Sequence, residues 1–382
     1  MQAVAEGAND FAFRLGAELI ADAGNENLVV SPFAVWLPVA ALVNAVEDNS
    51  KPTLLHALGA TGISETDINN AASRMMYGLV KSRRVGSGII KSPSKIVHAI
   101  FIDNRETLKR DFAQTYKDYF RGGTINVDFS SQHAIDAVNR WASEKTDGLI
   151  SGLVQGFKPA TVAAIAGAIF FSGDWEMQFD PGQTEEGIFH SPDGDTSAMF
   201  MLHKDTIHTY YEDDKIQALP LGFTSGGGMY IVLPKSGSAA DTFFSMTNDY
   251  FKEIRENSMQ ATGTLKLPRF SIENEVDGLK EALATMGIPL FEGNAPVLTG
   301  LVEGHTALSL SDAIQKATIR VDENGTTAAA VFYAGAAACE GPYIDPAEPF
   351  EMICDRPFVF ILYDLTHDGG YQVLFTGVVN QP

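Results

Sequence analysis

The chain has 382 residues, of which 45% are hydrophobic, 10% aromatic and 20% charged; this composition is typical of a globular protein with a large core. Acidic residues outnumber basic ones by 48 to 27, giving a formal net charge of −21, which argues against nucleic acid as a partner because phosphate binding needs a basic face. No apolar run approaches the ~18 residues that cross a bilayer, so no membrane association is expected, and the first residues lack the features of a signal peptide.

The first half of the chain is predicted to be mainly helical. Apolar residues recur with helical spacing over 8–21, 33–46 and 131–153. A short strand over 27–30 is expected to end at Ser31-Pro32. Ser31 is well placed there to cap the helix that follows, since serine is a preferred N-cap and proline a preferred first helical residue.

The second half is predicted to be rich in strands. Residues 161–171 form a nearly continuous apolar run, which is typical of a strand buried on both faces. Further strands are expected over 229–233, 265–272 and 313–321, with a helix over 276–286. The chain ends in two apolar segments, 358–363 and 371–379, which a His-Asp-Gly-Gly turn joins into a predicted hairpin.

Residues that bind metals or form disulfides are few and scattered. Cys339 and Cys354 are the only cysteines, too few for a disulfide framework or a zinc site, and Cys354 lies in an apolar segment that predicts burial. His203 and His208 are five residues apart, a spacing that places them neither on one helix face nor on one face of a regular strand. We therefore expect no metal and no cofactor. Because no repeat or linker divides the chain, residues 1–382 are predicted to form one α+β domain.

The segment 325–341 is unusual for a loop. It is rich in alanine, with no charge before Glu340 and no proline before Pro342, whereas loops normally carry Gly, Pro, Asn, Asp and Ser. Small uncharged residues suit a segment that enters a sheet as an added strand, because proline removes a ladder hydrogen bond and a buried charge is costly. Alanine also favours helices, so composition leaves strand insertion and a helical or flexible linker as equal alternatives.

The only N-glycosylation sequon, Asn324-Gly325-Thr326, falls at the start of this segment. A sugar there would obstruct insertion into a sheet. We therefore expect a chain that is not exposed to eukaryotic N-glycosylation, for which a prokaryotic origin is one simple explanation.

Several motifs, spread over the whole chain, match one known family in order and spacing. They are Asn27 to Pro32, Asn139-Arg-Trp141 with Thr146-Asp-Gly148, Phe170 to Trp175, Leu267-Pro-Arg-Phe270, Leu283 to Phe291, Glu323 to Ala330, Met352 to Leu362 and Phe375 to Pro382. On these residues the chain resembles a serpin from its first helix to Pro382. The resemblance implies the serpin fold, with three β-sheets, eight or nine helices and an exposed reactive-centre loop over about 323–349.

The resemblance also implies a mechanism. A serine protease attacks the exposed loop and forms an acyl-enzyme, and the loop then inserts into the main sheet, as serpin loops do, which traps the protease. No enzyme activity is implied, and the sequence has no Gly-x-Ser-x-Gly, phosphate-loop or His-Glu-x-x-His motif. A monomer that acts outside the cell or at its surface is expected.

The hinge of the loop separates two kinds of serpin. By the resemblance it comprises Glu323, Gly325, Thr326, Ala328, Ala329 and Ala330. Inhibitory serpins have small residues here, whereas non-inhibitory ones tend to have bulky, charged or proline residues. An inhibitor is therefore predicted, and a non-inhibitory binding or chaperone module is the alternative. Phe332 is large and would point inward by alternation from Thr326.

Two further regions control opening of the main sheet in the family. The resemblance assigns Trp175 to the breach and Ser31 to the shutter, where the family usually has two serines, an asparagine and a histidine. Only Ser31 matches; Ala34, Gly167 and Gln315 stand at the other positions. We expect Gln315 to replace the imidazole in this network.

The cleaved bond is predicted from family spacing. About fourteen residues after Gly325, the length of a fully inserted strand, lies the bond between Cys339 and Glu340. Because this loop is longer than in common relatives, Ala338 and Tyr343 are alternatives. Small residues before the bond favour an elastase-like or subtilisin-like target, and no Arg or Lys for a trypsin-like enzyme occurs between Arg320 and Arg356.

One basic cluster stands out in this acidic chain. It consists of Lys81, Arg83, Arg84, Lys91 and Lys95. A solvated surface is favoured over a site for a sulfated polysaccharide, given the net charge of the whole chain.

Overall fold

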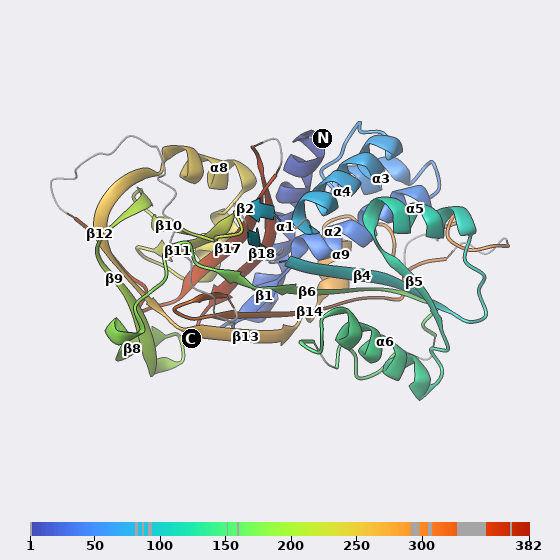
Figure 1. Ribbon diagram of the computed structural model, residues 1–382. Helices are drawn as coiled ribbons and strands as arrows, with labels where there is room; N and C mark the ends of the chain where they lie inside the picture. Colours follow the sequence, from blue (N-terminus) through green and yellow to red (C-terminus); the bar gives the residue numbers. More distant parts are fainter. Residues whose placement is uncertain are drawn as a thin grey trace.

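The computed structural model describes residues 2–80, 83–85, 88–90, 94–150, 152–158, 160–291, 298–304, 308–326, 349–366 and 369–382. Its described part contains α-helices and β-sheets that cover one another in layers (Figure 1). The helices are α1 (Gln2–Ala23), α2 (Pro32–Ala41), α3 (Lys51–Ala57), α4 (Glu65–Val80), α5 (Arg110–Phe120), α6 (Gln132–Lys145), α7 (Ala239–Ser245), α8 (Asn248–Asn257) and α9 (Leu279–Thr285), with short 3-10 turns at Leu42–Asn44 and Pro181–Gln183.

A seven-stranded sheet carries the residues that the hinge contacts. Its strands are β4 (Ser94–Asp103), β5 (Gly123–Val127), β6 (Ala163–Phe171), β7 (Gly173–Asp174), β13 (Phe270–Glu275), β14 (Asp312–Val321) and β15 (Gly325–Thr326). Their order is β5-β4-β6-β14-β15-β7, with β13 on the other side of β14. Strand β5 therefore forms a free edge.

A nine-stranded sheet forms the second layer. Its strands are β1 (Leu28–Val30), β8 (Glu185–Ser191), β9 (Gly194–Glu212), β10 (Ile216–Gly222), β11 (Gly228–Pro234), β12 (Met259–Pro268), β16 (Phe350–Ile353), β17 (Phe358–Leu365) and β18 (Tyr371–Val379). It has two parts, because β9 and β10 are joined through only two residue pairs, Gln217 with Glu212 and Ala218 with Tyr211. A two-stranded hairpin, β2 (Arg83–Val85) with β3 (Gly88–Ile90), is the third sheet of the described chain. The expected α+β class, with three sheets and nine α-helices in this part, is confirmed.

Helices cover both faces of the seven-stranded sheet. Figure 1 shows α2, α4 and α5 on one side of β4 and β6, and α6 on the other. A separate small core lies under α6, where Val138 and Trp141 meet Phe101 and the alanines Ala164, Ala166 and Ala168. Alanines on β6 leave room for α6 to lie close to the strand. In the described part of the chain, no helix is long and apolar enough to cross a membrane.

Helix α2 begins as expected, but two predicted helices end early. Ser31 caps α2, since its Oγ accepts a hydrogen bond from Ala34 N at 3.4 Å. The helix gives way to a 3-10 turn after Ala41. Helix α6 stops at Lys145 instead of continuing to 153, because Asp147 and Gly148 have φ angles of 54° and 81°. Left-handed residues end a right-handed helix whatever the apolar spacing beyond them.

Candidate functional site

The hinge meets the seven-stranded sheet where two of its strands diverge. Over most of their length β6 and β14 are direct parallel neighbours, from Ala164 opposite Asp312 onward. At the end of β6 the chain continues into β7, and β15 lies between β7 and β14. Strand β15 is antiparallel to both, with Thr326 opposite Val321 on one side and Gly173 on the other. Gly325 and Thr326 of the predicted hinge therefore form the beginning of a strand between these neighbours.

Gly325 and Thr326 are both tightly enclosed. Thr326 is completely buried, and its Oγ1 accepts a hydrogen bond from Gly173 N at 3.0 Å. Gly325 has a φ of 153°, and a Cβ at this position would lie 2.0 Å from the carbonyl oxygen of Gly173. Only glycine fits position 325 in this arrangement, and only a small side chain fits position 326.

Glu323, the first residue of the predicted hinge, anchors the segment that precedes β15. Its side chain is 4% exposed. Arg269 Nε donates to its Oε1 at 2.8 Å and to its Oε2 at 3.0 Å, and Thr184 Oγ1 donates to Oε1 at 2.5 Å. Burial by itself raises the pKa of this carboxyl, but the hydrogen bonds from Arg269 and Thr184 outweigh it and lower the pKa overall. Glu323 is thus held as a carboxylate at neutral pH.

Trp175 holds the same segment from the other side. It is 1% exposed, and its ring stacks on Phe223 with 4.7 Å between ring centroids. Its indole Nε1 donates to Asp322 O at 2.9 Å and its backbone N–H to Asn324 O at 2.8 Å. The residue that the resemblance assigns to the breach therefore contacts the backbone on both sides of Glu323.

Ser31 and Gln315 form the buried polar contact beneath the sheet. Ser31 N donates to Gln315 Oε1 at 2.8 Å, and Gln315 Nε2 donates to Ser31 O at 2.9 Å. Ser31 Oγ also donates to Leu374 O at 2.7 Å. Ala34 and Gly167 pack against each other, since a Cβ on Gly167 would lie 3.3 Å from Ala34 O. The Gln315 side-chain amide thus bridges α2 to β14 through two hydrogen bonds with the backbone of Ser31.

The other predicted site residues are not described by the structure. Residues 327–348 lie outside the described residues. They include Ala328, Ala329 and Ala330 of the hinge, Phe332, and the candidate bond residues Ala338, Cys339, Glu340 and Tyr343. Cys354 is described and is completely buried, as expected, and burial raises the pKa of its thiol.

A column of aromatic rings next to the hinge was not predicted. It consists of Phe179, His203, His208, Phe350 and Tyr210, and we call it the ring column. Successive ring centroids are 3.9, 5.1, 6.1 and 4.2 Å apart. Phe179 N donates to Glu323 O at 3.0 Å, while Phe350 directly follows the predicted loop, about 323–349. The ring column therefore connects the two ends of the loop across β9.

A β-bulge explains why the histidine spacing was misread. Leu265 lies opposite His203, and Gly263 lies opposite Thr206, so β9 uses three residue steps where β12 uses two. Asp205, in the bulge, has a φ of 49°. One extra residue changes the parity of a strand, so His203 and His208 share one face. The inference from their five-residue spacing that they cannot share a face is wrong.

Both histidines of the ring column are neutral at physiological pH. Each is 6% exposed. His203 Nε2 donates to Gln178 O at 3.2 Å, but His203 Nδ1 and His208 Nε2 have no hydrogen-bond partner among the described residues. Burial lowers the pKa of both, and that of His208 falls to about 4 with an added contribution from His203. Two unpaired ring nitrogens therefore lie in an apolar site beside the hinge.

Comparisons with known proteins agree with this geometry. The family profile described as "Serpin (serine protease inhibitor)" matches residues 6–382. Antichymotrypsin-2 of Bombyx mori is 30% identical over 381 residues, covering 97% of this chain and 96% of that protein. An uncharacterised serpin-like protein of Thermococcus kodakarensis is 28% identical over 377 residues, covering 98% of this chain and 84% of that protein.

The crystal structure of human thyroxine-binding globulin, solved as a complex, superposes with a TM-score of 0.84. It covers 99% of this chain and 98% of the globulin, at 23% sequence identity, and so bears on the fold alone. The match of the family profile over nearly every residue, together with a relative that is 30% identical along its whole length, shows that the chain belongs to the serpin family.

Proposed function

We propose that the chain inhibits serine proteases by inserting its reactive-centre loop, about 323–349, between β6 and β14 after the protease has acylated it. The observation that carries this proposal is the position of β15. Gly325 and Thr326 already pair with both flanking strands, and the next residues of the chain are small and uncharged. Continued pairing in the same direction would lead the loop between β6 and β14.

The topology of the sheet supports insertion on energetic grounds. Strands β6 and β14 are parallel neighbours, and β15 is antiparallel to both strands that flank it. A continued strand would replace one parallel pairing by two antiparallel ones, and antiparallel pairing is slightly more stable per residue. The new strand would also satisfy the backbone groups of the loop. Insertion therefore moves the chain toward a more stable sheet.

The target and the setting are further parts of the proposal. Alanines before the bond between Cys339 and Glu340 favour an elastase-like or subtilisin-like protease, with Ala338 and Tyr343 as alternatives for the bond. The Thermococcus relative supports a prokaryotic origin. We further propose that the inhibitor is a monomer and acts outside the cell or at its surface.

The test uses an elastase, subtilisin and trypsin with the intact chain. The elastase or subtilisin is expected to form a covalent complex that survives a denaturing gel, and trypsin is not, because no basic residue precedes any bond of the loop. Mass determination of the released C-terminal peptide identifies the bond. Cleavage of the loop is also expected to raise the melting temperature markedly. A cleaved chain with fully active protease and an unchanged melting temperature would support the non-inhibitory binding or chaperone alternative instead.

A further inference from the structure

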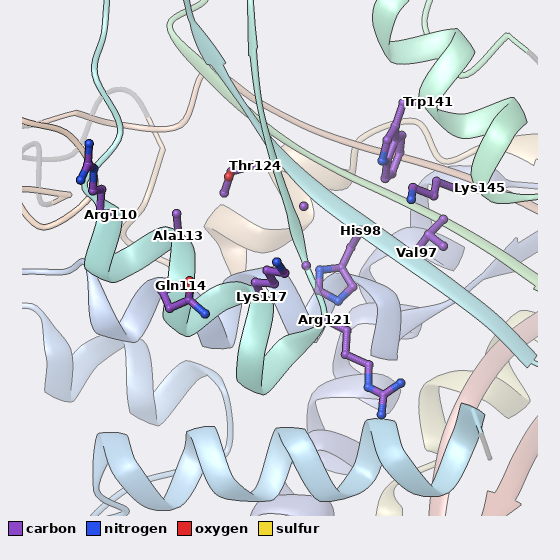
Figure 2. Close-up of a pocket in the computed structure, with 12 residues that line it drawn as sticks. Val97, His98, Arg110, Ala113, Gln114, Lys117, Arg121, Thr124, Trp141 and Lys145 are labelled. Carbon is purple, nitrogen blue, oxygen red and sulfur yellow. The ribbon is translucent and has the colours of Figure 1, made fainter.

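A basic pocket lies at the free edge of the seven-stranded sheet. It has a volume of about 700 Å³ and is lined by β4, β5, α5 and α6. Figure 2 shows Arg110 and Lys117 extending from α5, with Trp141 and Lys145 extending from α6 on the other side of the strands. The pocket therefore wraps around the edge strand β5 and is bordered by helices from both faces of the sheet.

The charge of this pocket is opposite to that of the molecule. Four cationic side chains line it, Arg110, Lys117, Arg121 and Lys145, and no Asp or Glu does. The whole chain, in contrast, has 48 acidic and 27 basic residues. Among the described residues, none of the four cations forms an ion pair within 4.0 Å. Four unpaired cations around one hollow repel one another unless an anion joins them.

The floor of the pocket is rigid. His98 on β4 is buried, with Nδ1 2.5 Å from Tyr116 Oη and Nε2 donating to Phe120 O at 3.0 Å. Burial lowers the pKa of His98 to about 4, so it adds no charge at neutral pH. A Cβ on Gly122 would lie 2.2 Å from the Tyr116 ring. These contacts fix the end of α5 against β4 and with it the backbone that carries Lys117 and Arg121.

We propose that this pocket binds a compact multivalent anion, a small molecule that carries two or more phosphate or sulfate groups. Its volume lies within the ~300–1,000 Å³ range of small-molecule sites. Arginine and lysine are the residues that bind phosphate and sulfate oxygens, arginine through two parallel hydrogen bonds and lysine as a point charge. A single small anion would reach one or two of the four cations, whereas a multivalent one bridges α5 and α6.

The binding test needs no protease, because Trp141 lines the pocket while Trp36 and Trp175 are buried elsewhere. Inositol hexakisphosphate, sucrose octasulfate and inorganic phosphate are titrated against the intact chain at constant ionic strength, with tryptophan emission and melting temperature as readouts. At least one multivalent probe is expected to saturate with a Kd below about 100 µM, and the two multivalent probes distinguish phosphate from sulfate. Similar weak effects from all three would overturn the site.

Variants locate the binding. Lys117→Gln/Lys145→Gln is expected to raise the Kd of the multivalent anion at least about tenfold, because two charge-assisted contacts are lost. The matched control Lys252→Gln removes an exposed lysine on α8 and leaves binding unchanged. Equal affinity for all three proteins overturns the pocket. If the parent chain traps protease but does not bind the anions, the anion site is wrong and the proposed function stands. If it binds the anions but does not trap protease, the proposed function is wrong and the anion site stands.

Discussion

At Gly325 and Thr326 the surrounding strands leave almost no space for a larger side chain. A Cβ on Gly325 would lie 2.0 Å from a backbone oxygen, and the Thr326 side chain is completely buried with its hydroxyl on Gly173 N. Backbone atoms of β7 form these walls, so they cannot move aside as a flexible side chain can. Glycine at position 325 and a small side chain at position 326 are therefore required by the strands that surround them.

If the chain inhibits as proposed, Thr326→Arg is expected to make it a substrate that is cleaved without trapping the protease. Position 326 is completely buried, and a guanidinium cannot be buried there without losing its hydration, which is costly for a charged group. The loop would then be cleaved without insertion. The number of inhibitor molecules consumed per trapped elastase or subtilisin is expected to rise at least about tenfold, measured by titration of residual protease activity.

Thr326→Ser is the matched control. It keeps the hydroxyl that accepts from Gly173 N and is expected to trap protease nearly as well as the parent chain. If the arginine variant still traps protease with full stoichiometry while its loop is cleaved at the same bond, insertion through the hinge is wrong.

The ring column shows what one bulged strand contributes. The extra residue in β9 turns His203 and His208 to one face, where they stack between Phe179 and Phe350. Phe179 binds the backbone of Glu323. The ring column lies against both ends of the loop. Protonation of one of its histidines is therefore expected to weaken the packing around Glu323.

Acid is expected to destabilise the native chain through these buried histidines. The pKa of His208 is lowered to about 4 from an ordinary value of 6.5, so the unfolded chain binds more protons between these values. The free energy of unfolding therefore falls as the pH falls from about 6.5 to 4, by about 3 kcal/mol at most for this residue. Urea unfolding of the parent chain and of His208→Phe at pH 7 and pH 4.5 measures the difference, and the variant should lose less stability.

The matched control for this prediction is His133→Phe. His133 is exposed on α6, so its replacement should leave the pH dependence of stability unchanged. His98 and His203 also have lowered pKa values because of burial, and they account for the slope that remains in the His208 variant. An identical pH profile for all three proteins would contradict a neutral, buried His208.

At the scale of the whole molecule, the parallel contact between β6 and β14 is where the proposed insertion would open the sheet. On their other sides, β6 pairs with β4 and β14 pairs with β13, and both of these pairings are antiparallel. The Ser31–Gln315 contact ties α2 to β14 under this region, and Gln315 lies opposite Gly167 of β6. Opening the sheet at this line therefore separates strands without breaking an antiparallel ladder.

A disulfide across this line is expected to abolish trapping reversibly. Ala166 and Ile314 are direct partners on β6 and β14, and neighbouring strands are close enough for a disulfide. In a Cys339→Ser background, oxidised Ala166→Cys/Ile314→Cys should be cleaved by the target protease without forming a covalent complex. Reduction should restore the complex, as seen on denaturing gels.

The control disulfide joins strands that stay together. Ala99 on β4 is also a direct partner of Ala166, so Ala99→Cys/Ala166→Cys introduces the same chemistry at the same residue of β6. This variant should trap protease in both redox states. If both disulfides abolish trapping, the effect is general rigidity of the sheet; if neither does, insertion does not pass between β6 and β14.

Patterns within a few residues of sequence correctly predicted the strands and helix starts that depend on neighbouring residues. The continuous apolar run over 161–171 became the buried strand β6, Ser31 caps α2, and the last two apolar segments pair as β17 and β18. Caps, runs and turns depend on neighbours a few residues away, so they can be read from the chain. The predicted start of α9 and the predicted end of α6 were less accurate, because left-handed residues (Gly278 before α9, Asp147 and Gly148 after α6) limit a helix independently of its apolar stripe.

The sequence by itself determined the family of this protein and the small, uncharged chemistry of its hinge, because both are carried by contiguous motifs. Only the tertiary structure decided how those motifs meet. Ser31 finds Gln315 across 284 positions of sequence, Trp175 holds Asp322 across 147, and a bulge in β9 brings two histidines to one face. Such contacts depend on strand register and on the packing of one layer against another, which no local periodicity encodes.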